Sequence, residues 1–221
     1  GRYRVVNMGE WSANAFRQYQ LLQTIDLKRD DIVIFYDGAV DAGSVYTVAV
    51  NRRRQTFPDS LCANLPDALQ ISVMWAMCSA VDGSVPAEIA DSAQLRMSLA
   101  QVATQYRDSI LMAASYTHHS RATFYHFLQP TIWSMPLSPA EQEMTSHPYV
   151  VQPQMDTVLS NAWPMLQHVL AHLQNVTTLD LTHVLDAARS AGVPLYLDCC
   201  HVTERGNAII ARSIFDDITT F

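Results

Sequence analysis

The sequence predicts a single α/β domain, spanning residues 1–221, with a mainly parallel sheet and helices on both faces. Short apolar runs of strand character alternate along the chain with longer segments whose apolar residues recur at helical spacing. The run at 31–36, DIVIFY, is apolar almost throughout, which is typical of a strand buried on both faces of a parallel sheet. With 221 residues, 49% of them hydrophobic, the chain can bury one sizeable core.

The first half of the chain predicts two strands and three helices. The β-branched run YRVVNM and the run DIVIFY indicate the strands, and apolar residues at three- and four-residue spacing indicate the helices. A polar segment with arginines and two prolines separates them and is expected to leave the core as a loop. In order, the expected elements are a strand at 3–8, a helix at 15–25, a strand at 31–36, the loop at 43–66, and helices at 68–80 and 88–115.

The second half continues the alternation of strands and helices. The expected elements are a strand at 122–128, a proline-rich passage at 136–153, a helix at 155–173, a strand at 178–181, and helices at 183–190 and 206–218. In a doubly wound sheet the loops that follow the strands meet in one crevice at the carboxyl ends of the strands. Three such loops carry polar residues, at 9–14, 37–41 and 198–201, and these define the candidate site.

Composition excludes several classes of function. The formal net charge is −7 and the only basic cluster is Arg52 to Arg54, so no surface for nucleic acid is predicted. No apolar run reaches the roughly 18 residues of a membrane-spanning helix. The four cysteines lack metal-type spacing and are expected to be reduced, while His168 and His172, four residues apart, offer only two ligands. No metal and no cofactor is therefore predicted.

Asp198 and His201 are the candidate catalytic residues. A histidine that takes a proton from a nucleophile needs its other ring nitrogen held by a carboxylate, and the spacing Asp-x-x-His in a loop can bring the two side chains into contact. The same spacing also fits a hydrogen-bonded pair that only fixes the loop and does no chemistry.

An ordered set of stretches carries a family resemblance over most of the chain: VVNMGEWSAN, DIVIFYDGAVDA, FYHFLQPTIW, LSPAEQ and YLDCCHVTERGNAIIA. Together they resemble the SGNH (GDSL-type) hydrolases, which are serine esterases and acyl hydrolases on a flavodoxin-like, three-layer α/β/α sheet. The resemblance implies that Asp198 and His201 form the family's acid–base pair. It places Ser12 at the family's oxyanion glycine and Val40 at the oxyanion asparagine of the Gly-x-Asn-Asp block.

The chain departs from that pattern where the chemistry is done. Valine at position 40 cannot donate a hydrogen bond to an oxyanion, and losing one such donor typically costs about 10²–10³ in turnover. The Gly-Asp-Ser turn that bears the family's nucleophile is absent. Asp82-Gly83-Ser84 has the same letters in another order and is expected to be an ordinary loop.

The resemblance also implies a missing strand. The family's sheet order, 2-1-3-4-5, puts its first strand between the segments at 3–8 and 31–36, and this chain lacks it. Each buried amide or carbonyl left unpaired there would cost about 1–3 kcal/mol. We therefore expect another polypeptide, or an upstream segment, to insert a strand at this place. Direct pairing of Val5 with Ile34 would contradict the expectation.

The leading hypothesis is a catalytically degenerate SGNH-hydrolase-like protein that acts as a structural or docking subunit of a larger assembly. The alternative is a serine ester hydrolase whose nucleophile is supplied upstream or in trans, with His201 as general base and the Ser12 amide as an oxyanion donor. A module that binds a carbohydrate or lipid in the crevice is a third class, without specific residues behind it. The chain begins with glycine rather than methionine, which fits processing and an organellar, for example mitochondrial, or membrane-complex setting.

Overall fold

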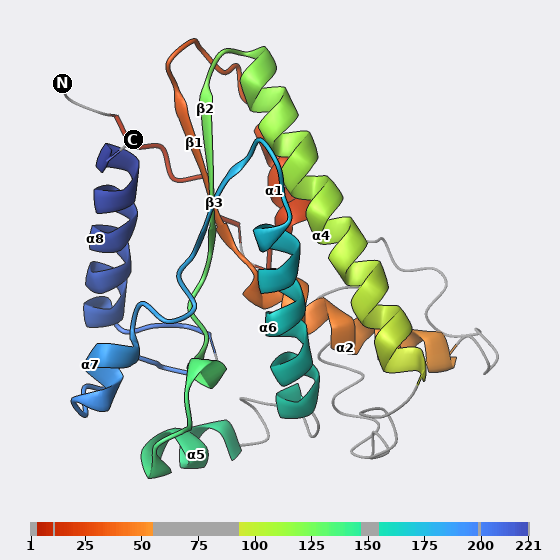
Figure 1. The fold of residues 1–221 in the computed structure, drawn as a ribbon, viewed down its shortest axis with the longest axis vertical. Coiled ribbons are helices and arrows are strands. Elements are labelled where there is room, and N and C mark those ends of the chain that lie inside the picture. The colour runs from red at the N-terminus through yellow and green to blue at the C-terminus, as the bar shows by residue number, and fades with distance from the viewer. Residues whose placement is uncertain (1–3, 11, 55–92, 147–154, 199, 221) are drawn as a thin grey trace.

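The computed structural model is an α/β fold with a three-stranded parallel sheet between two layers of helices (Figure 1). It describes residues 4–10, 12–54, 93–146, 155–198 and 200–220. The strands lie in the order β1-β2-β3, where β1 is Ile32–Asp37, β2 is Thr123–Leu128 and β3 is Thr177–Asp180. The α/β class, the parallel sheet and the strands expected at 31–36, 122–128 and 178–181 are confirmed.

Most of the helices cover one face of the sheet. This layer contains α1 (Ala15–Leu22), α2 (Ala39–Arg54), α4 (Ala93–His119) and α6 (Met155–Ala171). Its core joins Val33 and Phe35 of β1 to Phe124 and Leu128 of β2, with the rings of Phe35 and Phe124 in edge-to-face contact at 5.1 Å. The side chains at odd positions of β1 therefore point into this layer.

The opposite face is covered by α8 (Glu204–Thr220), with α7 (Asp186–Ser190) at its lower end in Figure 1. The core here joins Tyr125 and Phe127 of β2 to Ile210 of α8. The helices expected at 15–25, 88–115, 155–173, 183–190 and 206–218 correspond to α1, α4, α6, α7 and α8, with shifted ends. The helix expected at 68–80 lies outside the described residues.

Two segments expected to be irregular are helical. Much of the segment at 43–66 belongs to α2, because Ala42, Val45 and Tyr46 form a buried stripe at helical spacing; its residues from 55 onward lie outside the description. The proline-rich passage at 136–153 contains α5 (Pro139–Ser146). Proline is well tolerated at the first position of a helix. The expected loop is therefore wrong at 43–54, and the proline-rich passage contains a helix at 139–146.

The start of α5 is fixed by a reciprocal cap. The Glu141 amide donates to Ser138 Oγ at 3.3 Å, and the Ser138 amide donates to Glu141 Oε2 at 2.8 Å. This is the capping box that Ser-x-x-Glu encodes, and it is present in the sequence LSPAEQ. The cap explains why a helix begins at a proline.

The strand expected at 3–8 is wrong for the residues described there. Residues 4–8 form no strand, and Val5 is 88% exposed. A β-branched run adopts a strand only where a neighbouring strand takes its hydrogen bonds, and the described structure provides none beside it. Ile34 pairs with Tyr125 of β2 rather than with Val5. The outcome that would have contradicted a missing strand is therefore not found.

Among the described residues, no helix combines the length and the apolar character needed to cross a membrane.

Candidate active site

The loop that carries Asp198 and His201 is tied at its base. Tyr196 and Val202 form an antiparallel bridge, and the Leu197 amide donates to the His201 carbonyl at 2.8 Å. Leu195 and Tyr196, just before the loop, are buried in the core under α8. The loop is therefore held from both ends on the body of the domain.

The two predicted residues are in contact. His201 Nδ1 lies 2.6 Å from Asp198 Oδ2. Asp198 Oδ1 accepts hydrogen bonds from the amides of Cys200 and His201 at 2.9 and 2.7 Å. The carboxylate orients the imidazole and the backbone orients the carboxylate, which is the arrangement that an acid–base pair requires.

The electrostatics of the pair favour an ionised Asp198. Partial burial raises the pKa of this carboxyl group, but the hydrogen bonds from the amides of Cys200 and His201 and from the imidazole outweigh burial and lower the pKa below its usual value. The side chain of His201 is 60% exposed. The imidazole is therefore accessible from solvent.

The residues after His201 explain why the block ends in Thr-x-x-Gly. Thr203 caps α8, because its Oγ1 accepts from the Gly206 amide at 3.3 Å. A Cβ atom on Gly206 would lie 2.9 Å from Val202 Cβ and 3.0 Å from the Leu195 carbonyl oxygen. Glycine at this position lets the helix pack directly on the loop that carries His201.

The other two predicted loops are joined to each other at the carboxyl end of β1. The buried carboxylate of Asp41 accepts from the Ala15 amide, with N···O distances of 3.3 and 3.2 Å. Burial and the nearby charge of Asp37 raise the pKa of Asp41 well above its usual value. This contact brings the segment after Ser12 against the first turn of α2, which contains Val40.

Ser12 and Val40 occupy these loops in different ways. Ser12 has φ +57°, in the left-handed region that glycine adopts at little cost. The Val40 side chain is partly exposed and offers no hydrogen-bond donor. Gly38 has φ +122°, and a Cβ there would lie 2.4 Å from Leu128 Cδ1, so the Asp-Gly turn after β1 requires glycine.

Tyr36, near the carboxyl end of β1, lies within electrostatic range of the Asp198–His201 loop. Burial of its hydroxyl raises the pKa of Tyr36, and the charge of the nearby Cys200 thiolate raises it further. The loop therefore lies beside the last residues of β1, on the α8 side of the sheet.

The sequence reasoning missed a buried polar cluster beneath α4. His126 Nε2 lies 2.8 Å from Asp37 Oδ1, and the Tyr106 hydroxyl donates to Asp37 Oδ1 at 3.1 Å and lies 3.1 Å from His126 Nε2. All three side chains are nearly or fully buried. No local motif marks them, because they come from β1, α4 and β2. The cluster holds the strand end that leads into Gly38.

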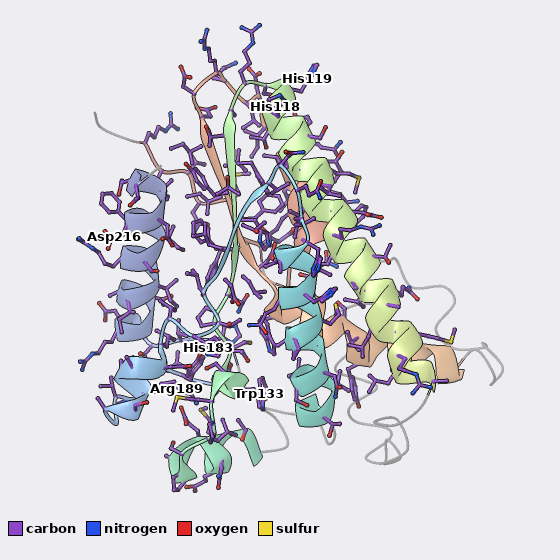
Figure 2. The ribbon with its side chains drawn as sticks, in the orientation of Figure 1. His118, His119, Trp133, His183, Arg189 and Asp216 are labelled. Carbon is purple, nitrogen blue, oxygen red and sulfur yellow. The ribbon has the colours of Figure 1, made fainter. Side chains whose placement is uncertain are left out.

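A small pocket of about 190 Å³ was also missed. It lies between α6 and the loops after β2 and β3, and is lined in part by Thr131, Trp133, Trp163, Gln167, Thr182 and His183. Figure 2 labels Trp133, His183 and Arg189 at this lower end of the sheet. Its lining comes from three segments of the chain, at 131–134, 160–167 and 182–183, which are too far apart in sequence for spacing to give a signal.

Ser134 and His183 line the pocket and both contact Asp186, but the three are not in the order of a nucleophile relay. Ser134 Oγ donates to Asp186 Oδ1 at 2.6 Å, and His183 Nδ1 lies 2.7 Å from Asp186 Oδ2. The carboxylate thus stands between the hydroxyl and the imidazole, whereas activation of serine needs the imidazole in the middle. Arg189 donates to Ser134 Oγ at 3.1 Å and completes a structural network.

Comparison of the chain with family models, with curated proteins and with solved structures gives no significant match.

Proposed function

We propose that this protein is a catalytically degenerate SGNH-hydrolase-like domain that acts as a docking subunit, and that a further strand from another polypeptide or an upstream segment adds to the edge of β1. The observation that carries the proposal is the direction of the backbone groups of β1. The Thr123 amide donates to the Asp31 carbonyl and the Gln129 amide to the Asp37 carbonyl, each at 2.8 Å.

These two bonds fix which residues of β1 face β2. In a parallel ladder the N–H and C=O of one residue point to the same side, and alternate residues point to opposite sides. Odd-numbered residues of β1 therefore bond to β2, and Ile32, Ile34 and Tyr36 direct their amides and carbonyls to the other edge. In the part of the chain that is described, no strand pairs with that edge.

The side chains of the same residues also lack cover. Ile34 and Tyr36 are in register with Tyr125 and Phe127, so they lie on the face that α8 covers farther along the sheet. Yet Ile32, Ile34 and Tyr36 are 40%, 43% and 37% exposed. An edge strand with free backbone groups and large apolar side chains is the surface on which strand addition occurs.

The test compares the chain alone with the assembly isolated from its natural source. In the assembly, the amides of Ile32, Ile34 and Tyr36 should exchange hydrogen slowly, and in the isolated chain they should exchange fast, because only an added strand takes their hydrogen bonds. Equal exchange in both samples would contradict docking at this edge.

A pair of surface variants supplies the control. Ile34→Lys places a charge on the edge strand, whereas Leu111→Lys places one on the similarly exposed outer surface of α4. We expect Ile34→Lys to reduce the assembly to the free 24.7 kDa chain and Leu111→Lys to leave it intact. Equal behaviour of the two variants would indicate that another surface holds the assembly together.

The Asp198–His201 contact favours a second candidate, a serine ester hydrolase whose nucleophile arrives with the added strand. A strand that runs parallel to β1 along its open edge would end beside Tyr36, and Tyr36 lies near the loop of His201. The left-handed Ser12, at the position of the family's oxyanion glycine, supports the same candidate. Val40 opposes it, because a valine side chain donates no hydrogen bond.

A fluorophosphonate probe applied to the whole assembly distinguishes the two candidates. Labelling that is lost in His201→Ala would establish the hydrolase and end the degenerate interpretation. The matched control is His183→Ala, since His183 has the same spacing to its aspartate, a similar distance of 2.7 Å and a similar exposure of 63%. Absence of labelling, with the assembly intact, would support the docking subunit.

A further inference from the structure

We infer that Asp198, Cys200 and His201 form a binding site for a borderline-soft divalent cation, with Zn²⁺ as the best fit. Each residue offers one ligand atom, and the three atoms all lie within 4.8 Å of one another. Carboxylate oxygen, thiolate sulfur and imidazole nitrogen are the three donors that zinc sites in proteins use. The inference depends on these side chains and not on either candidate function.

The distances require only small movements. With bonds of about 2.0–2.3 Å in a tetrahedral arrangement, ligand atoms lie about 3.3–3.6 Å apart. His201 Nδ1 is 2.6 Å from Asp198 Oδ2 and 3.9 Å from Cys200 Sγ. The nitrogen and oxygen must therefore separate by about 1 Å or less, and the sulfur must approach the nitrogen by a few tenths of an ångström. The sulfur and the carboxylate oxygen lie within 4.8 Å of each other and must approach by at most about 1.5 Å, and rotations of the side chains can supply these movements.

The charges also fit. Asp198 would bind as the carboxylate, through the Oδ2 atom that faces His201 Nδ1. Cys200 would bind as the thiolate and His201 as neutral imidazole, since both must lose the proton that competes with the metal. Two negative ligands and one neutral ligand balance the charge of Zn²⁺. Calcium and magnesium fit poorly, because they prefer oxygen donors.

The site would leave one coordination position to solvent or to a ligand from outside. Three protein ligands with an open fourth position are characteristic of accessible zinc sites, whereas buried structural sites supply four. His201 is 60% exposed, which leaves space on the outer side of the ion. The ion would occupy Nδ1 and so replace the contact between His201 and Asp198. If the hydrolase candidate holds, Zn²⁺ should then inhibit it.

Titration with Co²⁺ tests the inference, because a cobalt–thiolate bond gives a near-ultraviolet charge-transfer band. We expect one equivalent to bind, with the band lost in Cys200→Ser and binding weakened at least tenfold in His201→Ala and Asp198→Asn. Cys199→Ser is the matched control and should keep the band. Circular dichroism checks that each variant is folded.

A second measurement uses Zn²⁺ in competition with a chromophoric chelator. The affinity should fall as the pH is lowered, because protons on the Cys200 thiol and on the His201 imidazole compete with the ion. An unchanged charge-transfer band in Cys200→Ser, its loss in Cys199→Ser, or affinity equal in the wild type and in His201→Ala would overturn the site. None of these readouts depends on assembly or on hydrolysis, so failure of the site and failure of the proposed function are separate results.

Discussion

Substitution of neighbouring residues of β1 by proline measures whether its outer edge is free. Proline removes the backbone N–H and is tolerated on an edge strand where that N–H faces solvent. The N–H of Ile34 points away from β2, while the N–H of Val33 points toward it, by the alternation that the Asp31 and Asp37 carbonyls establish. Ile34→Pro and Val33→Pro therefore make the same chemical change on opposite sides of one strand.

The expected costs differ by several kcal/mol. Val33→Pro deletes one ladder hydrogen bond and leaves a carbonyl of β2 without its partner, which costs about 1–3 kcal/mol. It also reshapes a buried side chain in the core with Phe35, which adds about 1–2 kcal/mol. Ile34→Pro removes no hydrogen bond within the described structure and alters a side chain that is 43% exposed, so its cost should be about 1 kcal/mol or less.

Urea denaturation followed by circular dichroism gives both free energies of unfolding. We expect Val33→Pro to lose about 2–5 kcal/mol, a large part of the 5–15 kcal/mol that small domains have, and Ile34→Pro to stay near the wild type. Similar losses for both variants would refute the reasoning, because the N–H of Ile34 would then have a partner within the isolated chain. In the assembly, by contrast, Ile34→Pro should block strand addition, although the isolated chain stays folded.

Three further substitutions test the site region. Asp41→Asn should remove one pH dependence: the raised pKa of Asp41 means that wild-type stability falls as the pH rises from about 4 through the raised value. The amide variant, free of repulsion from Asp37, should lack this fall in urea titrations at several pH values. Gly206→Ala should lower the free energy of unfolding by about 1–3 kcal/mol, because the new Cβ meets Val202 at 2.9 Å, and an unchanged melting temperature would contradict that packing. Ser12→Gly should stabilise the chain by up to about 1 kcal/mol in thermal melts, since glycine adopts φ +57° without strain; destabilisation would mean that the serine side chain is needed.

The sequence predicted the elements whose signal is local and continuous. DIVIFY became β1, and the spacing Asp-x-x-His became a contact of 2.6 Å between Asp198 and His201. Burial of β1 on both faces did not follow from its apolar run, because even-numbered residues remain half exposed in the described structure. The apolar composition of a strand indicates which side chains favour burial. Whether they are buried depends on the segments that pack against them.

The elements that were wrongly predicted are those in which helix-breaking residues obscure a helical pattern. The arginines and the two prolines of the segment at 43–66 suggested a loop, but the buried stripe with Val45 stabilises α2 as far as residue 54. Pro139 suggested irregular structure, although Ser138 and Glu141 encode a cap around it. The cluster of Asp37, Tyr106 and His126 could not be predicted, because its members come from three elements and meet only after the sheet and α4 pack.

The chain contains two pairs of histidine and aspartate at the same spacing, and comparison of the two shows what carries the functional argument. His183 and Asp186 are 2.7 Å apart and His201 and Asp198 are 2.6 Å apart, with similarly exposed imidazoles. Asp186 also accepts from Ser134, so its carboxylate belongs to a network that braces the loops around α7. Spacing and distance therefore do not separate a structural pair from a reactive one.

The two pairs differ in their surroundings. The Asp198 carboxylate is held by two backbone amides, and the loop lies near the open edge of β1. The Cys200 thiol stands beside its imidazole, at 3.9 Å from His201 Nδ1. A strand added to that edge, or a cation bound by the three side chains, would act on this pair and leave the pair at His183 unchanged. The hydrolase candidate and the cation site thus both require that substitution of His201 change the readout and that substitution of His183 leave it as it is.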